Sequence, residues 1–174
     1  MRKPRFFLHT LLGVVIGAGA CSGDQPLPSE PAQASLLGGL TGTLNAVLLS
    51  CSPLPSSRSS ATIGSQGGVL VVGPHVLVVA PNALSQPVTI TGEVVSGSVN
   101  SVRFSPEGLQ FSGDGAALTM SYSNCSGLGM LLPKKIAYTN ELLSILSVLN
   151  SLDLSGQQRV VGQLKHFSRY AVAY

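Results

Sequence analysis

The side chains with the clearest chemical potential in this sequence are His166 and Ser168, two residues apart near the end of the chain. A serine hydroxyl becomes a nucleophile when a base takes its proton, and imidazole suits that role near neutral pH. Residues i and i+2 of a β-strand lie on one face, so a strand here would align both side chains and turn Phe167 into the core. Glu141 and Asp153 are both candidates for a carboxylate that orients the imidazole, and the sequence does not choose between them.

A structural role fits the same residues. His166 and Ser168 can lie on the solvent-facing rim of the last strand, because alternating side chains indicate only a strand. His75 follows Gly73-Pro74 and is expected in a turn. The sequence holds no G-x-S-x-G elbow, no phosphate-binding loop and no metal-ligand spacing. We therefore expect no metal, no cofactor and no small-molecule ligand.

Cys21 follows a stretch with the features of an export signal. Residues 1–5 are cationic, Phe6 to Gly19 is an apolar run too short to span a membrane well, and Ala18-Gly19-Ala20 precedes the cysteine. This arrangement resembles the lipobox of bacterial lipoproteins, in which the cysteine is lipidated; Ala18 stands where that family usually has Leu. The alternative is an ordinary A-x-A cleavage site with Cys21 next in line. We favour a lipoprotein signal peptide at 1–20 and a lipid anchor on Cys21.

Two cysteines remain if Cys21 carries lipid, namely Cys51 and Cys125. In an oxidising compartment such a pair predicts a disulfide. The alternative is a two-cysteine metal site, which no nearby histidine supports. We expect the disulfide, and a location in the bacterial cell envelope facing outside the cytoplasm, at the outer membrane or cell surface.

The net charge of +3 is a property of the precursor. Arg2, Lys3 and Arg5 are expected to leave with the signal peptide, so that the remaining chain has seven basic and seven acidic side chains. No basic patch remains to neutralise phosphates, and we expect no binding of nucleic acid.

The rest of the chain divides by composition. Residues 21–35 are rich in proline, serine and acids and predict a flexible tether. Residues 36–60 predict a short helix, over 36–49, and a loop. Residues 61–174 contain short β-branched runs separated by turn residues, which predict an all-β antiparallel sandwich. Residues 141–154 fit a helix face or a buried strand.

Motifs in residues 60–174 resemble, in order, those of the ZU-five domain, the β-sandwich module named for zonula occludens proteins and Unc-five-type netrin receptors. They are Gly67-Gly68-Val69-Leu70, Ala80-Pro81-Asn82-Ala83-Leu84, Pro87-Val88-Thr89-Ile90, Phe104 to Phe111, Ala117 to Tyr122 and His166 to Val172. Asn82 stands where that family prefers glycine, which implies a backbone position with positive φ that asparagine tolerates best after glycine.

The resemblance also bears on His166-Phe167-Ser168. In some relatives a ZU-five-like domain cuts its own chain between the Phe and the Ser of this motif. Here Ser168 would attack the Phe167 carbonyl and water would hydrolyse the ester, whereas many domains of this fold cut nothing. We expect a membrane-anchored structural or protein-interaction module that binds an unidentified envelope protein, with self-cleavage between Phe167 and Ser168 as the alternative.

Overall fold

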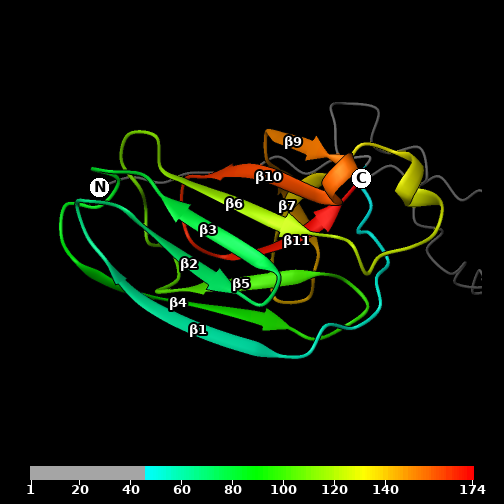
Figure 1. Ribbon diagram of the computed structural model, residues 1–174, viewed down its shortest axis with the longest axis horizontal. Coiled ribbons are helices and arrows are strands. Elements are labelled where there is room, and N and C mark those ends of the chain that lie inside the picture. Colours follow the sequence, from blue (N-terminus) through cyan, green and yellow to red (C-terminus); the bar gives the residue numbers. More distant parts are fainter. Residues whose placement is uncertain (1–45) are drawn as a thin grey trace, which may run out of the picture. The chain divides into compact units, whose positions relative to one another are not determined.

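Two antiparallel sheets pack face to face in residues 46–174, which are the residues that the computed structural model describes (Figure 1). One sheet has six strands in the order β1-β4-β5-β11-β7-β8, and the other has five in the order β2-β3-β6-β10-β9. All strand pairs are antiparallel. This confirms the predicted all-β antiparallel sandwich.

The strands of the six-stranded sheet are β1 (Ser57–Ile63), β4 (Val88–Val95), β5 (Ser101–Ser105), β11 (Arg169–Ala173), β7 (Lys135–Thr139) and β8 (Ile145–Val148). The strands of the five-stranded sheet are β2 (Gly68–Val72), β3 (His75–Val79), β6 (Ala116–Ser121), β10 (Arg159–Leu164) and β9 (Ser151–Leu154). Two short 3₁₀ turns, η1 (Leu128–Leu131) and η2 (Ser155–Gln157), lie in connections.

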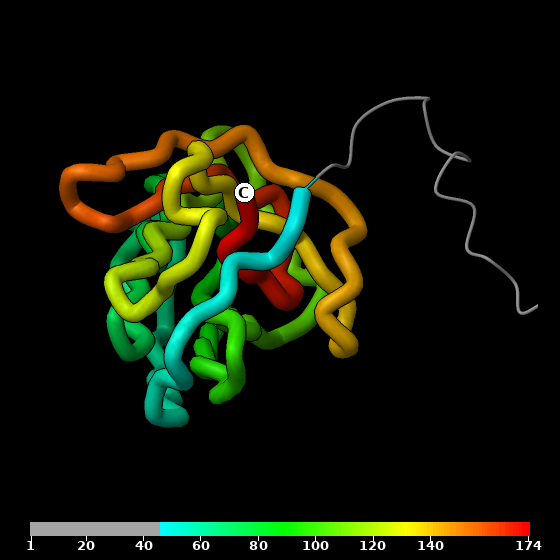
Figure 2. The backbone as a smooth tube through the Cα atoms, turned by 90° about the vertical axis from the view of Figure 1, so that its right-hand side faces the viewer, coloured from blue at the N-terminus to red at the C-terminus, as the bar shows by residue number. Residues whose placement is uncertain are grey.

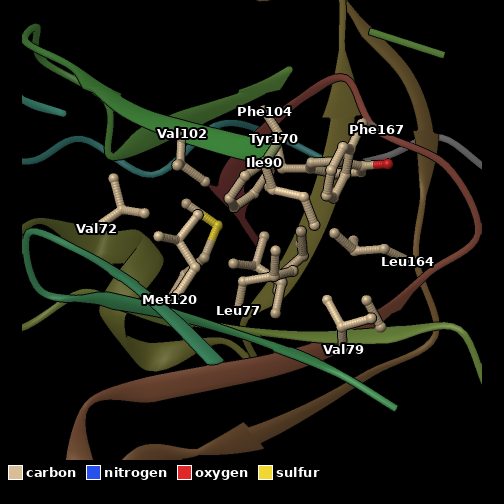
Figure 3. Close-up of a cluster of buried hydrophobic side chains, with 14 of the residues drawn as sticks. Val72, Leu77, Val79, Ile90, Val102, Phe104, Met120, Leu164, Phe167 and Tyr170 are labelled. Atoms are coloured by element: carbon tan, nitrogen blue, oxygen red, sulfur yellow. The ribbon is translucent and has the colours of Figure 1, made fainter. Parts of the chain in front are cut away.

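The apolar alternation of the sequence produces the core between the sheets. Strand β4 alternates buried and less buried residues along most of its length, with Ile90 and Val94 inside. Figure 3 shows labelled side chains that fill the core, among them Leu77 from β3, Phe104 from β5 and Phe167 from the segment between β10 and β11. Gly92 is required here, because a Cβ at this position would lie 2.4 Å from the Val72 Cγ2 atom.

Residues 141–154 form strands and not a helix. Strand β8 pairs with β7 in one sheet, and β9 pairs with β10 in the other. The chain therefore crosses from one sheet to the other at 149–150, so that the apolar run of β8 and the apolar run of β9 belong to different sheets. The run Leu109–Phe111, which alternates like a strand, makes only a single bridge from Gln110 to His166.

The segment that enters the domain runs beside the last strand (Figure 2). Leu48 bridges Ala173, and the Val47 and Tyr174 backbones exchange hydrogen bonds of 3.0 Å. Residues 46–49 are thus extended, whereas the sequence predicted a helix over 36–49, whose first part lies outside the described residues. The predicted loop also ends early, because β1 already begins at Ser57 and pairs with β4.

The predicted disulfide between Cys51 and Cys125 is present, with an S–S distance of 2.07 Å. It joins the entering segment to the loop that follows β6, across a sequence separation of 74 residues. Asn82 has φ 61°, in the left-handed region, where the resemblance implied glycine. The predicted signal peptide, Cys21 and the predicted tether lie outside the described residues.

Candidate functional site

The segment His166-Phe167-Ser168 lies between β10 and β11 and is not part of either strand. This corrects the expectation of a strand that aligns residues 166 and 168. His166 is half-buried, Ser168 is buried, and Phe167 is fully buried. The inward position of Phe167 is as expected, and its ring stacks on Phe104 with centroids 5.2 Å apart and meets the edge of Phe111 at 4.9 Å.

The segment between Phe104 and Leu109 holds the backbone around the Phe167–Ser168 bond. The Phe167 N–H donates to the Leu109 carbonyl at 2.8 Å, and the Gly108 N–H donates to the Phe167 carbonyl at 3.0 Å. The Phe104 N–H donates to the Ser168 carbonyl at 3.0 Å. The Phe167 carbonyl is therefore polarised by a backbone donor, which is the type of contact that stabilises an oxyanion in acyl transfer. Sequence reasoning missed Gly108, since its role depends on a contact 59 residues away along the chain.

The imidazole of His166 is directed toward the Phe167 carbonyl rather than the serine. Its Nδ1 atom lies 3.4 Å from the Phe167 oxygen. Its ring packs edge-on against Tyr138, with centroids 4.9 Å apart, and the Tyr170 hydroxyl donates to the His166 carbonyl at 2.6 Å. Within residues 46–174 no hydrogen bond joins His166 to the Ser168 hydroxyl, so the structure does not bring the predicted base and nucleophile together.

Both candidate carboxylates have other partners. Glu141 forms an ion pair with Arg103, and its Oε2 atom lies 3.8 Å from the Arg169 Nη1 atom. Asp153 accepts the Tyr122 hydroxyl at 2.6 Å and the Lys134 backbone N–H at 2.8 Å. Neither carboxylate hydrogen-bonds to His166 in the described part of the chain.

Arg169 is a buried cation at the start of β11. Its Nη1 donates to the Glu141 carbonyl at 2.7 Å and its Nη2 donates to the Ser101 hydroxyl at 3.0 Å. Burial lowers the pKa of the guanidinium, and nearby Glu141 opposes that change. The bond to the Glu141 carbonyl fastens the loop that contains Glu141 to the start of β11, and the bond to Ser101 joins β11 to β5.

An open cleft of about 300 Å³ borders this loop. It is lined by Glu107, Tyr138, Thr139, Asn140, Glu141, Leu142, Leu146 and Ser168. Ser168 therefore borders a space large enough for water, whereas His166 is not among the lining residues.

His75 lies in the core and not in a turn. It is fully buried on the inner side of β3, and its Nδ1 accepts the Ser121 N–H at 3.2 Å. Its Nε2 atom has no partner in the described part of the chain. Burial lowers the pKa of His75 to about 4, so the ring is neutral and structural at neutral pH.

The outer sides of the two sheets differ in chemistry. The outer side of the five-stranded sheet, here called the apolar face, consists of Val69, Val71, Val76, Val78, Ala117, Thr119, Leu152 and Val161. The outer side of the six-stranded sheet around β1, β4 and β5, here called the polar face, consists of Arg58, Ser60, Thr62, Thr89, Thr91, Glu93 and Arg103.

No helix in residues 46–174 is long and apolar enough to cross a membrane. The same residues contain no group of three or more side chains placed to hold a metal ion. The disulfide is the structural feature that bears on location, because such bonds persist outside the reducing cytoplasm.

No family model matches the sequence, and no curated protein matches it. The class of protein therefore follows from the structure itself. The described part of the chain is an antiparallel β-sandwich with one disulfide, one polar outer face and one apolar outer face.

Proposed function

We propose that this chain is a lipoprotein of the bacterial cell envelope, anchored through Cys21, whose β-sandwich acts as a protein-interaction module. The apolar face is the observation that carries the proposal. Monomeric proteins seldom leave a large contiguous apolar patch in water, and such patches mark interaction sites. The resemblance to the ZU-five domain supports a scaffold or interaction role, since residues 60–174 carry, in order, motifs that resemble those of that module.

Export and anchoring are supported by the signal-like residues 1–20 and by the disulfide. Growth with a labelled fatty acid tests the anchor. The wild-type chain is expected to take up label and to sediment with membranes, while Cys21→Ser is expected to lose both properties. Cys125→Ser is the control, because it removes a cysteine without removing the acylation site. A chain that is unlabelled and fully released would contradict the anchor.

Self-cleavage between Phe167 and Ser168 is a second candidate, favoured by the Gly108 N–H on the Phe167 carbonyl. The Ser168 Oγ would bond to the Phe167 carbonyl carbon, the C–N bond would break, and the Oγ proton would pass to the departing amine. Water would then hydrolyse the ester to a Phe167 carboxylate and restore the hydroxyl. The missing His166–Ser168 hydrogen bond means that the imidazole must first turn, which ranks this candidate second.

Intact mass under denaturing, non-reducing conditions separates the two candidates. Denaturation is needed because the product 168–174 contains β11, which is paired on both sides by β5 and β7. An intact chain that is two hydrogens light from the disulfide supports the interaction module. A chain without residues 168–174, made whole by Ser168→Ala and by His166→Ala, would establish cleavage instead.

A further inference from the structure

Ser168 is a buried residue whose hydroxyl still lacks a partner. Its exposed fraction is 8%, and within residues 46–174 the hydroxyl makes no hydrogen bond. The hydroxyl is not sealed in the core either, since Ser168 lines the open cleft and its oxygen is not one of the fully enclosed polar atoms of the domain. Buried polar groups are nearly always satisfied, by protein or by a bound molecule. The hydroxyl is therefore available to a ligand in the cleft.

The charged side chains that line the cleft are both acidic. They are Glu107 and Glu141, and the lining contains no cationic side chain from the described residues. Glu141 forms an ion pair with Arg103, whereas Glu107 has neither an ion pair nor a hydrogen bond in residues 46–174. An ionised carboxylate accepts hydrogen bonds and donates none. The cleft therefore offers an uncompensated negative charge and suits a ligand that is a positively charged donor.

The turn that carries Glu107 is held beside Ser168 by the backbone. The Gly108 N–H donates to the Phe167 carbonyl at 3.0 Å, so this turn lies against the Phe167–Ser168 peptide. Glu107 and Ser168 come from distant segments of the chain and border the same space. A carboxylate and a hydroxyl in one cleft together provide acceptors for one charged donor.

Large apolar and aromatic side chains line another part of the cleft. Leu142 is 87% exposed, Leu146 is 48% exposed, and Tyr138 adds an aromatic ring. The aliphatic stem of a basic side chain packs readily on apolar surface, and an aromatic ring attracts a nearby cation. The lining therefore matches a cation on an aliphatic stem better than an inorganic cation.

The loop that forms this wall is held in place before any ligand binds. The Asn140 Oδ1 atom accepts the Leu142 N–H at 3.0 Å and the Ser144 N–H at 2.9 Å. The Arg169 guanidinium donates to the Glu141 carbonyl at 2.7 Å. A site that is already ordered does not lose binding free energy to the ordering of its walls.

We propose that this cleft binds a lysine side chain of a partner protein. Its volume of about 300 Å³ is at the lower limit for ligand sites, which suits one side chain and not a large cofactor. The three donors of an ammonium group can turn toward acceptors on different segments, whereas a guanidinium has a fixed fork that fits a single carboxylate. The proposal rests on the interaction module above and names a feature of its partner, but it uses the cleft and not the apolar face.

A titration with Nα-acetyl-lysine N-methylamide, followed by ¹H–¹⁵N NMR of the exported Cys21→Ser chain, tests the site. From about 0.1 mM to about 50 mM ligand, the amide signals of Gly108, Asn140 and Leu142 are expected to shift and to saturate. The uncharged norleucine analogue is the control and is expected to cause no saturable shift. The arginine analogue is expected to bind at least about threefold more weakly. No saturable shift with the lysine compound, equal shifts with the norleucine compound, or tighter binding of the arginine compound would overturn the proposal.

Variants of the cleft assign the binding to its residues. Glu107→Gln keeps the size of the side chain and is expected to weaken lysine binding roughly fivefold or more. Glu93→Gln is the matched control, since it makes the same change on the polar face, and it is expected to leave binding unchanged. Ser168→Ala is expected to weaken binding roughly twofold to tenfold. Leu142→Lys, at an exposed position, is expected to weaken it by placing a competing cation at the cleft. Equal affinities of wild type and Glu107→Gln would overturn the proposal.

Cross-linking in the cell separates failure of this proposal from failure of the interaction module. A photo-reactive amino acid at position 142 is expected to capture a lysine-containing segment of a partner protein, and the capture is expected to be lost in the Glu107→Gln chain. Capture that does not depend on Glu107, or of a segment without lysine, would overturn the lysine site and leave the interaction module standing. No capture at position 142 and none at position 71 on the apolar face would overturn both.

Discussion

The two outer sheet faces are built from the same kind of strand and present opposite chemistry to the surroundings. On the polar face, the Ser60 and Thr91 hydroxyls lie 2.7 Å apart and those of Thr62 and Thr89 lie 3.1 Å apart. On the apolar face, valine stands opposite valine in the pairing of β2 with β3. Cross-strand pairs of the first type are satisfied in water, whereas pairs of the second type gain free energy when they are covered.

The sequences of the strands already differ in this respect. Strand β1 is polar at every outward position (Arg58, Ser60 and Thr62), as expected for a strand with one side in water. Strands β2 and β3 are nearly continuous valine and leucine, a pattern typical of strands buried on both sides. The structure covers only one of these sides and leaves the outward valines of β2 and β3 exposed.

The largest expected effect compares neighbours on one strand. Leu77 is fully buried and Val78 is exposed on the apolar face, both in β3. Leu77→Ala removes buried methyl groups and leaves a cavity, which is expected to cost about 2–5 kcal/mol of unfolding free energy. Val78→Ala is expected to cost under about 1 kcal/mol in the monomer. Urea unfolding at low protein concentration measures both values. Equal losses of unfolding free energy would contradict the assignment of Leu77 to the core side of β3 and of Val78 to its exposed side.

The next effect concerns His75, inside the sheet that bears the apolar face. Its pKa falls from 6.5 to about 4 on folding, so below pH 6.5 the unfolded chain takes up a proton that the folded chain refuses. Stability is therefore lost as the pH falls from about 6.5 to about 4, by up to roughly 3 kcal/mol at 1.36 kcal/mol per pKa unit. Urea unfolding at a series of pH values measures this loss.

The control for the histidine is His75→Asn, whose amide does not titrate and whose Oδ1 atom takes the place of Nδ1, so that it can still accept the Ser121 N–H. This variant is expected to lose less stability than wild type between pH 7 and pH 4.5, even if it is less stable at pH 7. Parallel pH profiles for the two chains would contradict the assignment of the acid effect to His75.

A smaller effect is expected at the ion pair of the six-stranded sheet. The side chains of Arg103 and Glu141 are 40% and 58% exposed, so their attraction is screened by water and worth about 0.5 kcal/mol. Glu141→Gln is expected to cost up to about 1 kcal/mol, since it also removes a negative charge beside buried Arg169, and the cost is expected to shrink in high salt. Glu107→Gln, in the same cleft but in no ion pair of the described residues, is the control. A loss that does not depend on salt would contradict this account.

The smallest effect is expected from polarity on the apolar face. Val69→Thr keeps the β-branched shape and is exposed, so it is expected to change the unfolding free energy of the monomer by less than about 0.5 kcal/mol. Ile63→Thr, at a buried position of β1, is the control and is expected to cost several times more because its hydroxyl has no partner in the core. A large loss at position 69 in dilute protein would mean that the face is already covered within the monomer.

The sequence predicted most of the strands because alternation is a local property. Strands β2, β3, β4, β5 and β6 all lie within residues 61–174, whose short β-branched runs predicted strands. Residues 141–154 were ambiguous, because their leucines fit a helix and a strand equally well, and long-range pairing with β7 and β10 decided the outcome. The site was predicted less well. The spacing of His166 and Ser168 assumed a strand, whereas residues 165–168 form a connection between β10 and β11 in which His166 makes an isolated bridge to Gln110.

By itself, the sequence determined the all-β class and the pairing of Cys51 with Cys125, while the positive φ of Asn82 was implied by the family resemblance. The first two follow from residue alternation and from cysteine count, which act locally or by elimination. Only the tertiary structure decided that Glu141 forms an ion pair with Arg103 and that Asp153 accepts a hydrogen bond from Tyr122. It also decided that His75 is buried and that the outer side of β2 and β3 is exposed. The physical reason is that burial and partners depend on which strands lie side by side, and this pairing joins residues far apart in the chain.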